Sequence, residues 1–176
     1  MPARSSRKSQ KRTSVPSPGE YAAFISQIEL VAIWLHQARV ENRIGPEQPE
    51  QLNISVQSRA RWDSTSDGFI AYHEYTVRVD YGENLAAALD VTFGVRYTSG
   101  APMTDEIFNV FQHTSLPLNT WPYLREFVAS MLGRMNWLPF AIPALKLGVP
   151  SGEDDVEPAS SAHPHANRDR PRAPGS

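Results

Sequence analysis

The sequence contains no cysteine among its 176 residues. Disulfide bonds, thiol nucleophiles and zinc–thiolate sites are therefore excluded. No apolar run is long enough to cross a bilayer, and the basic N-terminal residues are not followed at once by the apolar stretch of a signal peptide. We therefore expect a soluble, cytoplasmic protein that is not inserted into a membrane.

Sequence patterns of common catalytic sites are missing as well. The chain has no Walker-type phosphate loop, no GxSxG nucleophile elbow and no HExxH zinc motif. His73 is adjacent to Glu74, but neighbouring residues of a strand face opposite sides and would not form a dyad. We interpret His36, His73 and His113 as structural or surface residues. We predict neither an enzyme nor a bound cofactor or metal.

Charge is unevenly distributed along the chain. The net charge is −2, yet residues 1–18 hold five basic residues and no acid. We predict that residues 1–18 form a disordered basic arm, which is either a solubilising segment or a contact to nucleic acid or a membrane surface. Residues 148–176, rich in Pro, Ser and charge, are predicted to form a disordered tail. The folded domain, residues 19–147, is acidic, which argues against a nucleic-acid partner for it.

Three stretches of the predicted domain alternate between apolar and polar residues. These are residues 52–62, 69–79 and 85–97, separated by turn clusters at residues 63–68 and 82–84. The pattern predicts three consecutive antiparallel strands, each with one buried and one wet face. The wet face, open to solvent or a docking partner, comprises Asn53, Ser55, Gln57, Arg59, Glu74 and Arg78.

The segment from Tyr21 to Val40 is ambiguous by itself. Its apolar residues fit the period of a helix as well as that of a strand. Its content of β-branched and aromatic residues favours a strand, but composition leaves both alternatives open.

Helical periodicity begins after Gly100. Thr104 is a suitable N-cap, followed by acidic residues in the first turn, and the pattern predicts a short helix that ends near Thr114. A second, longer helix is predicted from about Asn119 to Met135, with Pro122 in its first turn.

The longer helix is apolar over much of its circumference. Such a helix packs on two sides, for instance on its own sheet and on a partner subunit. We therefore predict an oligomer interface that includes Trp121, Leu124, Phe127, Val128 and Met131.

Residues 118–143 read LNTWPYLREFVASMLGRMNWLPFAIP. This run resembles the main helix of the SecB family of protein-export chaperones, with its Pro-Tyr-x-Arg-Glu core at residues 122–126 and a following extended stretch that carries Pro139 and Pro143. The resemblance covers about residues 20–147 and places residues 28–35 on the family's first strand. It implies an α+β fold, in which a four-stranded antiparallel sheet is followed by a short and a long helix.

The resemblance also implies a function. SecB-like proteins are ATP-independent chaperones (holdases) that assemble as homotetramers, each a dimer of dimers, and hold unfolded client proteins in apolar grooves. Members deliver precursors to the SecA motor for export, or protect an antitoxin of a toxin–antitoxin system. The acidic residues with which export members dock SecA fall on Ala32 and His36 here, which puts docking to SecA in doubt; SecA and an antitoxin both stay open as partners. The implied client-binding candidates are Trp34, Leu35, Ile107, Phe108, Phe111, Trp137, Leu138 and Phe140.

Other interpretations stay open at this point. Each client-binding candidate can equally be an ordinary core or interface residue, because large apolar side chains are buried in most proteins. The sheet and long helix could instead form a small-ligand-binding domain or an adaptor for a single partner.

Overall fold

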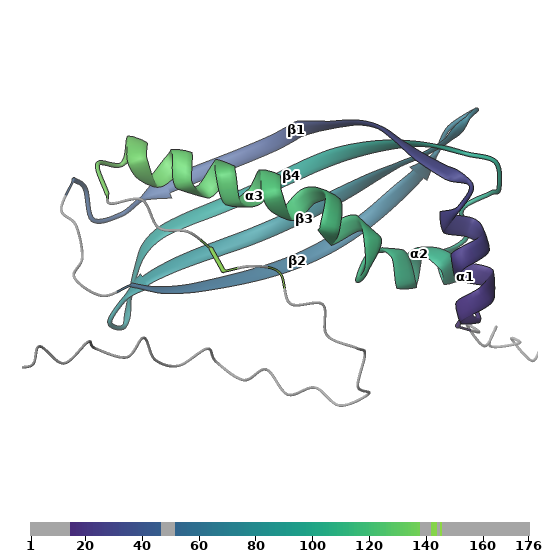
Figure 1. Cartoon of the computed structure of the whole chain (residues 1–176). Helices are drawn as coiled ribbons and strands as arrows, with labels where there is room; N and C mark the ends of the chain where they lie inside the picture. The colour runs from purple at the N-terminus through teal and green to yellow at the C-terminus, as the bar shows by residue number, and fades with distance from the viewer. Residues whose placement is uncertain (1–14, 47–51, 138–141, 144, 146–176) are drawn as a thin grey trace, which may run out of the picture.

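The computed structural model describes residues 15–46, 52–137, 142, 143 and 145. A four-stranded antiparallel sheet is followed by a short and a long helix, as predicted, and a further helix precedes the sheet (Figure 1). The predicted C-terminal tail and most of the predicted arm lie outside the described residues. In chain order the elements are α1 (Pro18–Ile25), β1 (Ile28–Asn42), β2 (Asn53–Ser64), β3 (Gly68–Tyr81), β4 (Asn84–Ser99), α2 (Asp105–Phe111) and α3 (Ser115–Arg134).

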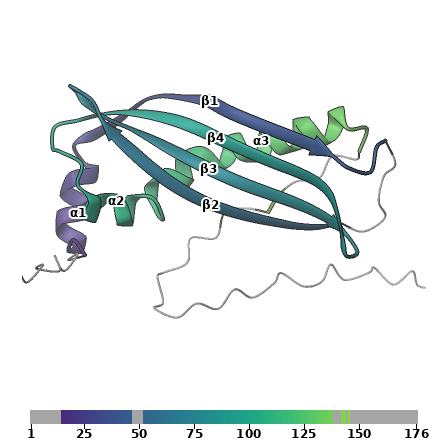
Figure 2. The same cartoon turned by 180° about the vertical axis from the view of Figure 1, so that it is seen from behind.

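The sheet has the strand order β1-β4-β3-β2. Strands β2, β3 and β4 form the predicted meander, and β1 pairs antiparallel with β4 at the far edge. Helix α3 crosses one face of the sheet, which we call the inner face (Figure 1). Seen from behind, the strands lie in front of α3, and no described helix covers the outer face (Figure 2).

The alternation in the sequence sets these two faces. Every second residue of β3 from Phe69 to Val79 is buried, and the residues between them are half-buried. On β2, the predicted polar residues from Asn53 to Arg59 are exposed, and the apolar residues between them at 54 and 56 are half-buried. Side chains alternate across a strand, so the apolar set faces α3 and the polar set faces solvent.

The ambiguous segment contains a helix as well as a strand. The resemblance assigned it to a strand, but residues up to Ile25 are helical and only the part from Ile28 onward is β1. The helix has a capping box, in which the Ser17 hydroxyl accepts from the Glu20 amide and the Glu20 carboxylate accepts from the Ser17 amide. Pro18 follows the cap at the first helical position, where a missing N–H costs nothing.

The predicted start of the long helix was wrong. Helix α3 begins at Ser115, so Pro122 lies inside the helix and not in its first turn. Pro122 has no N–H to offer the Leu118 carbonyl. Both residues are exposed, so water can reach that carbonyl. The short helix agrees with its prediction at the start, where the Thr104 hydroxyl accepts from the Ile107 amide.

The core between the sheet and the helices has two parts. The first, the α3 cluster, lies under the long helix and joins Leu124, Val128 and Leu132 to residues of β3 and β4 such as Val77 and Leu89. The second, the α1/α2 cluster, lies at the other end of the sheet, beneath the two short helices. Its buried members are Phe24, Phe69, Ala71, Val95, Tyr97, Met103, Phe108, Phe111 and Leu116.

Candidate functional site

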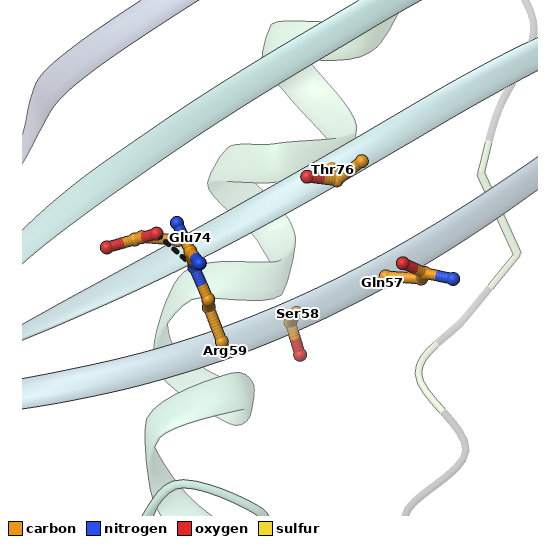
Figure 3. A pocket seen from close by; sticks show the side chains of 5 residues that line it. All are labelled: Gln57, Ser58, Arg59, Glu74 and Thr76. Atoms are coloured by element: carbon orange, nitrogen blue, oxygen red, sulfur yellow. Dashed lines mark hydrogen bonds and ion pairs between the residues drawn. The ribbon is translucent and has the colours of Figure 1, made fainter.

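The outer face of the sheet is polar and shallowly hollowed. Three hollows of about 270, 360 and 210 Å³ lie along it. Figure 3 shows the first of them, lined by β2 and β3 side chains, with the Arg59–Glu74 ion pair at one end. Further ion pairs on this face join Arg78 to Asp90 at 3.1 Å and Arg96 to Asp67 at 2.8 Å. Because both signs are interleaved, the face does not present a field of one sign to a partner.

Hydrogen bonds from nearby side chains lower the pKa of two acids on this face. The hydrogen bond from Arg43, followed by that from Arg39, lowers the pKa of Glu41. The hydrogen bond from Arg96, followed by that from Thr65, lowers the pKa of Asp67. These carboxylates therefore stay ionised and paired, as expected for a solvated surface rather than for a general acid.

Metal-binding groups and membrane-spanning helices are absent from the part of the chain that the structure describes. No group of three or more His, Cys, Asp or Glu side chains in these residues could hold a metal ion. No helix in the same residues is both long and apolar enough to cross a membrane.

Trp34, a predicted client-binding residue, lies over the outer face. It pairs with Gly94 of β4, and its indole occupies the space that a Cβ at position 94 would need. His36 lies beside it, with its ring centroid 4.9 Å from that of Tyr72. The guanidinium of Arg61 covers the Tyr72 ring at 3.8 Å. Trp34 therefore fills a gap left by glycine, in a small aromatic group that the sequence pattern did not indicate.

The inner face has an exposed apolar strip between β1 and α3, formed by Leu30, Leu35 and Tyr123. The two leucines pair with Tyr97 and Phe93 of β4, so their side chains are directed to the inner face. The Tyr123 ring of α3 lies 6.2 Å from that of Phe93. The exposed fractions of the three strip residues are 48%, 49% and 48% in the order given. Of the predicted client-binding residues, Leu35 belongs to this strip.

The structure places three other predicted client-binding residues in the core. Phe108, Phe111 and Trp137 are 5%, 0% and 3% exposed, so they are not accessible to a client in this conformation. Ile107 is half-buried against the α1/α2 cluster. Leu138 and Phe140 lie outside the described residues. Sequence spacing identified the correct helix faces but not what covers them.

The predicted interface residues are divided in the same way. Leu124 and Val128 are fully buried within this chain, where they form the centre of the α3 cluster. Trp121, Phe127 and Met131 are half-buried at the margins of the same cluster. The packing of α3 on its own sheet thus accounts for Leu124 and Val128. The three half-buried residues stay available for contact with a partner.

The buried hydroxyl of Thr120 joins α3 to β3 through hydrogen bonds that the sequence did not predict. The Thr120 hydroxyl donates to the Leu116 carbonyl at 3.0 Å. It therefore accepts from the Tyr75 hydroxyl and from Nδ1 of His73, each at 2.8 Å. Burial, reinforced by the charge of His113, lowers the pKa of His73 to about 4, so this imidazole is neutral at physiological pH.

Comparison with known proteins rests on structure. No family model matches the sequence, and no curated protein is significantly similar to it. Among solved structures, the chain resembles the Mycobacterium tuberculosis SecB-like chaperone Rv1957, in a complex with a ChAD peptide from the HigA1 antitoxin. The TM-score is 0.64 at 18% identity, over 70% of this chain and 95% of that one.

The protein has a SecB-like fold. This confirms the resemblance drawn from residues 118–143 and the predicted fold class. The similar protein is a SecB-like chaperone.

Proposed function

We propose that this protein is an ATP-independent chaperone that holds unfolded or partly folded segments of other proteins. The observation that carries the proposal is a SecB-like fold whose inner face leaves the Leu30, Leu35 and Tyr123 strip exposed. Large apolar side chains exposed on one face of a domain are typical of a site for protein contact. Unfolded segments expose the apolar side chains that folded proteins bury, so they are suitable ligands for such a face.

The client is a protein segment, and an antitoxin is the first candidate. The similar Mycobacterium tuberculosis chaperone was solved with an antitoxin peptide, which supports a peptide as the ligand of this fold. A precursor for export is the second candidate. The proposal does not include docking to SecA, because Ala32 and His36 replace the acids expected for it and the outer face mixes both signs of charge. Either client would be met in the cytoplasm.

Self-association belongs to the same proposal. Strand β1 is a 15-residue edge strand, and Val31, in one of its two irregular positions, is 53% exposed. A long edge strand with exposed apolar residues pairs readily with another strand. A second copy that pairs along β1, followed by packing through the margins of α3, gives the homotetramer that the resemblance implies.

Aggregation of a chemically denatured enzyme, diluted into buffer without nucleotide, tests this function. We expect the full chain to suppress light scattering at a near-stoichiometric ratio, and its mass in the same sample to be that of a tetramer. The variant Leu35→Lys/Tyr123→Lys should lose most of the suppression. Its matched control, Ser55→Lys/Gln57→Lys, adds the same charge to the exposed outer face and should retain it.

Two results would count against the proposal. A folded wild-type protein that leaves aggregation unchanged at every ratio would overturn the chaperone function. Equal suppression by the strip variant and its control would overturn the strip as the client surface.

A further inference from the structure

Three buried aromatic rings form a box at the end of the sheet that α1 covers. The rings of Phe69 and Tyr97 stack with centroids 4.9 Å apart. Phe111 of α2 stands edge-on to both, at 5.7 Å from Phe69 and 5.3 Å from Tyr97. Phe24 of α1 closes the box, 6.3 Å from Phe69. Stacked and edge-to-face rings at these distances attract one another through their quadrupoles, and the position of Phe24 shows that the box accepts an aromatic side chain.

The helix that supplies Phe24 is short and is held by few side chains. Helix α1 has eight residues; Phe24, which is 3% exposed, is its one buried residue, and Tyr21 and Ile25 are half-buried against the same cluster. The Tyr21 hydroxyl ties it to the α2–α3 junction through hydrogen bonds to Thr114 and Ser115 at 2.7 and 2.8 Å. A helix of this length is not stable by itself in water and depends on such contacts.

Helix α1 is connected to the sheet by a single turn. Ser26 and Gln27 form this turn between the helix and β1. The Gln27 carbonyl accepts from the Gly100 amide at 3.0 Å, whereas the Gln27 amide and side chain donate to the Phe24 and Ala23 carbonyls of α1. The other three rings of the box come from β3, β4 and α2, so elements other than α1 hold them.

We propose that the Phe69, Tyr97 and Phe111 box is a second client-binding site, and that α1 is a displaceable cover whose Phe24 stands in for an aromatic side chain of the client. The inference rests on the proposed chaperone function and names the ligand: a peptide segment with an aromatic anchor. It also explains why residues of α2 that were predicted to bind clients are buried. The chain's own helix shields this end of the sheet until a client competes for it.

Competition of this kind has a measurable consequence. When a site is open for only part of the time, the apparent affinity falls in proportion to the open fraction. Weakening the cover should therefore tighten the binding of an aromatic peptide, whereas most substitutions in a binding protein weaken binding. The direction of the change separates a cover from a structural helix.

The probe is a short Gly-Ser-Lys peptide with two phenylalanines, and its control has alanines in their place. Phe24→Ala should bind the phenylalanine peptide roughly fivefold more tightly than the wild type, or better. Ala22→Ser, an exposed change on the same helix, is the matched control and should leave the affinity unchanged. Tyr21→Phe keeps the ring but removes both hydroxyl bonds, so it should give a smaller gain. It also keeps the test valid if Phe24→Ala fails to fold.

Hydrogen exchange on the wild-type protein provides a second readout. The phenylalanine peptide should reduce the protection of amides in residues 21–27 and increase that of the segment around Phe69. Unchanged protection of α1, together with equal or weaker binding by folded Phe24→Ala and Tyr21→Phe, would overturn the inference. Because aggregation suppression is measured separately, a chaperone that suppresses aggregation but fails this test loses the second site and not the function.

Discussion

The two parts of the core differ in how they are covered. The α3 cluster lies under one continuous helix of 20 residues, whose Leu124, Val128 and Leu132 are all fully buried. The α1/α2 cluster lies under two helices of eight and seven residues and is built largely from aromatic rings. A long helix cannot withdraw one side chain without lifting its neighbours, whereas a short helix has fewer contacts to break. The comparison teaches that one end of the sheet is held by a single continuous element, and that the other is where the proposed opening would occur.

The largest expected effect is at the centre of the α3 cluster. Leu124→Arg places an unpaired charge where the side chain has no exposed surface, at a cost of about 3–5 kcal/mol. A typical domain has only about 5–15 kcal/mol of stability, so we expect loss of cooperative unfolding or of soluble protein. Urea denaturation measures this, with the exposed change Glu126→Arg as the control. If Leu124→Arg unfolded at the same urea concentration as the wild type, this end of the sheet would not be a continuous core.

A smaller effect follows from the titration of His73 beneath α3. The unfolded chain binds a proton at the ordinary pKa near 6.5, and the folded chain does so only at about 4. Stability should therefore be constant above about pH 7 and fall as the pH drops from 6.5 to 4, by up to about 3 kcal/mol. Urea denaturation over this range should show a slope that His73→Gln flattens, since its amide does not titrate.

The exposed change Ser55→Gln, which alters no titratable group, should keep the wild-type slope. A steep slope that persists in His73→Gln would assign the acid sensitivity to other groups and would weaken the view of the α3 end as the stable part.

The smallest expected effect concerns the hydroxyl that joins α3 to β3. Thr120→Val preserves the shape of the side chain but leaves the His73 and Tyr75 polar atoms without their partner, at a cost of about 1–3 kcal/mol. The outer-face change Thr76→Val also removes a threonine hydrogen bond, to Asp90 at 3.1 Å, but solvent can replace it. Its effect should stay within about 0.5 kcal/mol. Equal destabilisation by the two valines would contradict the difference between the faces.

Much of the fold could be predicted because period and turn chemistry are local. The alternation from Leu52 to Tyr97 was enough to predict the meander and its wet face, and Thr104 was enough to predict the start of α2. Helix α1 was missed because its eight residues span barely two turns, too few to separate helical from strand periodicity. The start of α3 was misplaced because Pro122 was interpreted as a first-turn residue, although it is also tolerated at an exposed position inside a helix.

The candidate site was harder to predict than the fold. Phe111 and Leu35 were equal candidates in the sequence, since both are large apolar residues next to expected grooves. The structure makes one fully buried and leaves the other about half exposed. The spacing of apolar residues in a sequence is the same whether a residue lines an open groove or is buried beneath another segment of the chain. In the sequence, Tyr123 is only a member of the Pro-Tyr-x-Arg-Glu core, and its position beside Phe93 shows that it borders the exposed strip.

By itself, the sequence determined the meander of β2, β3 and β4, its two faces, the start of α2 and the resemblance to SecB, because these depend on residue types at fixed local spacing. The tertiary structure decided which apolar residues are exposed, that Thr120 joins His73 to Tyr75, and that α1 closes the aromatic box. These features bring together residues far apart in the chain. They depend on the path of the chain between those residues, which local spacing does not specify.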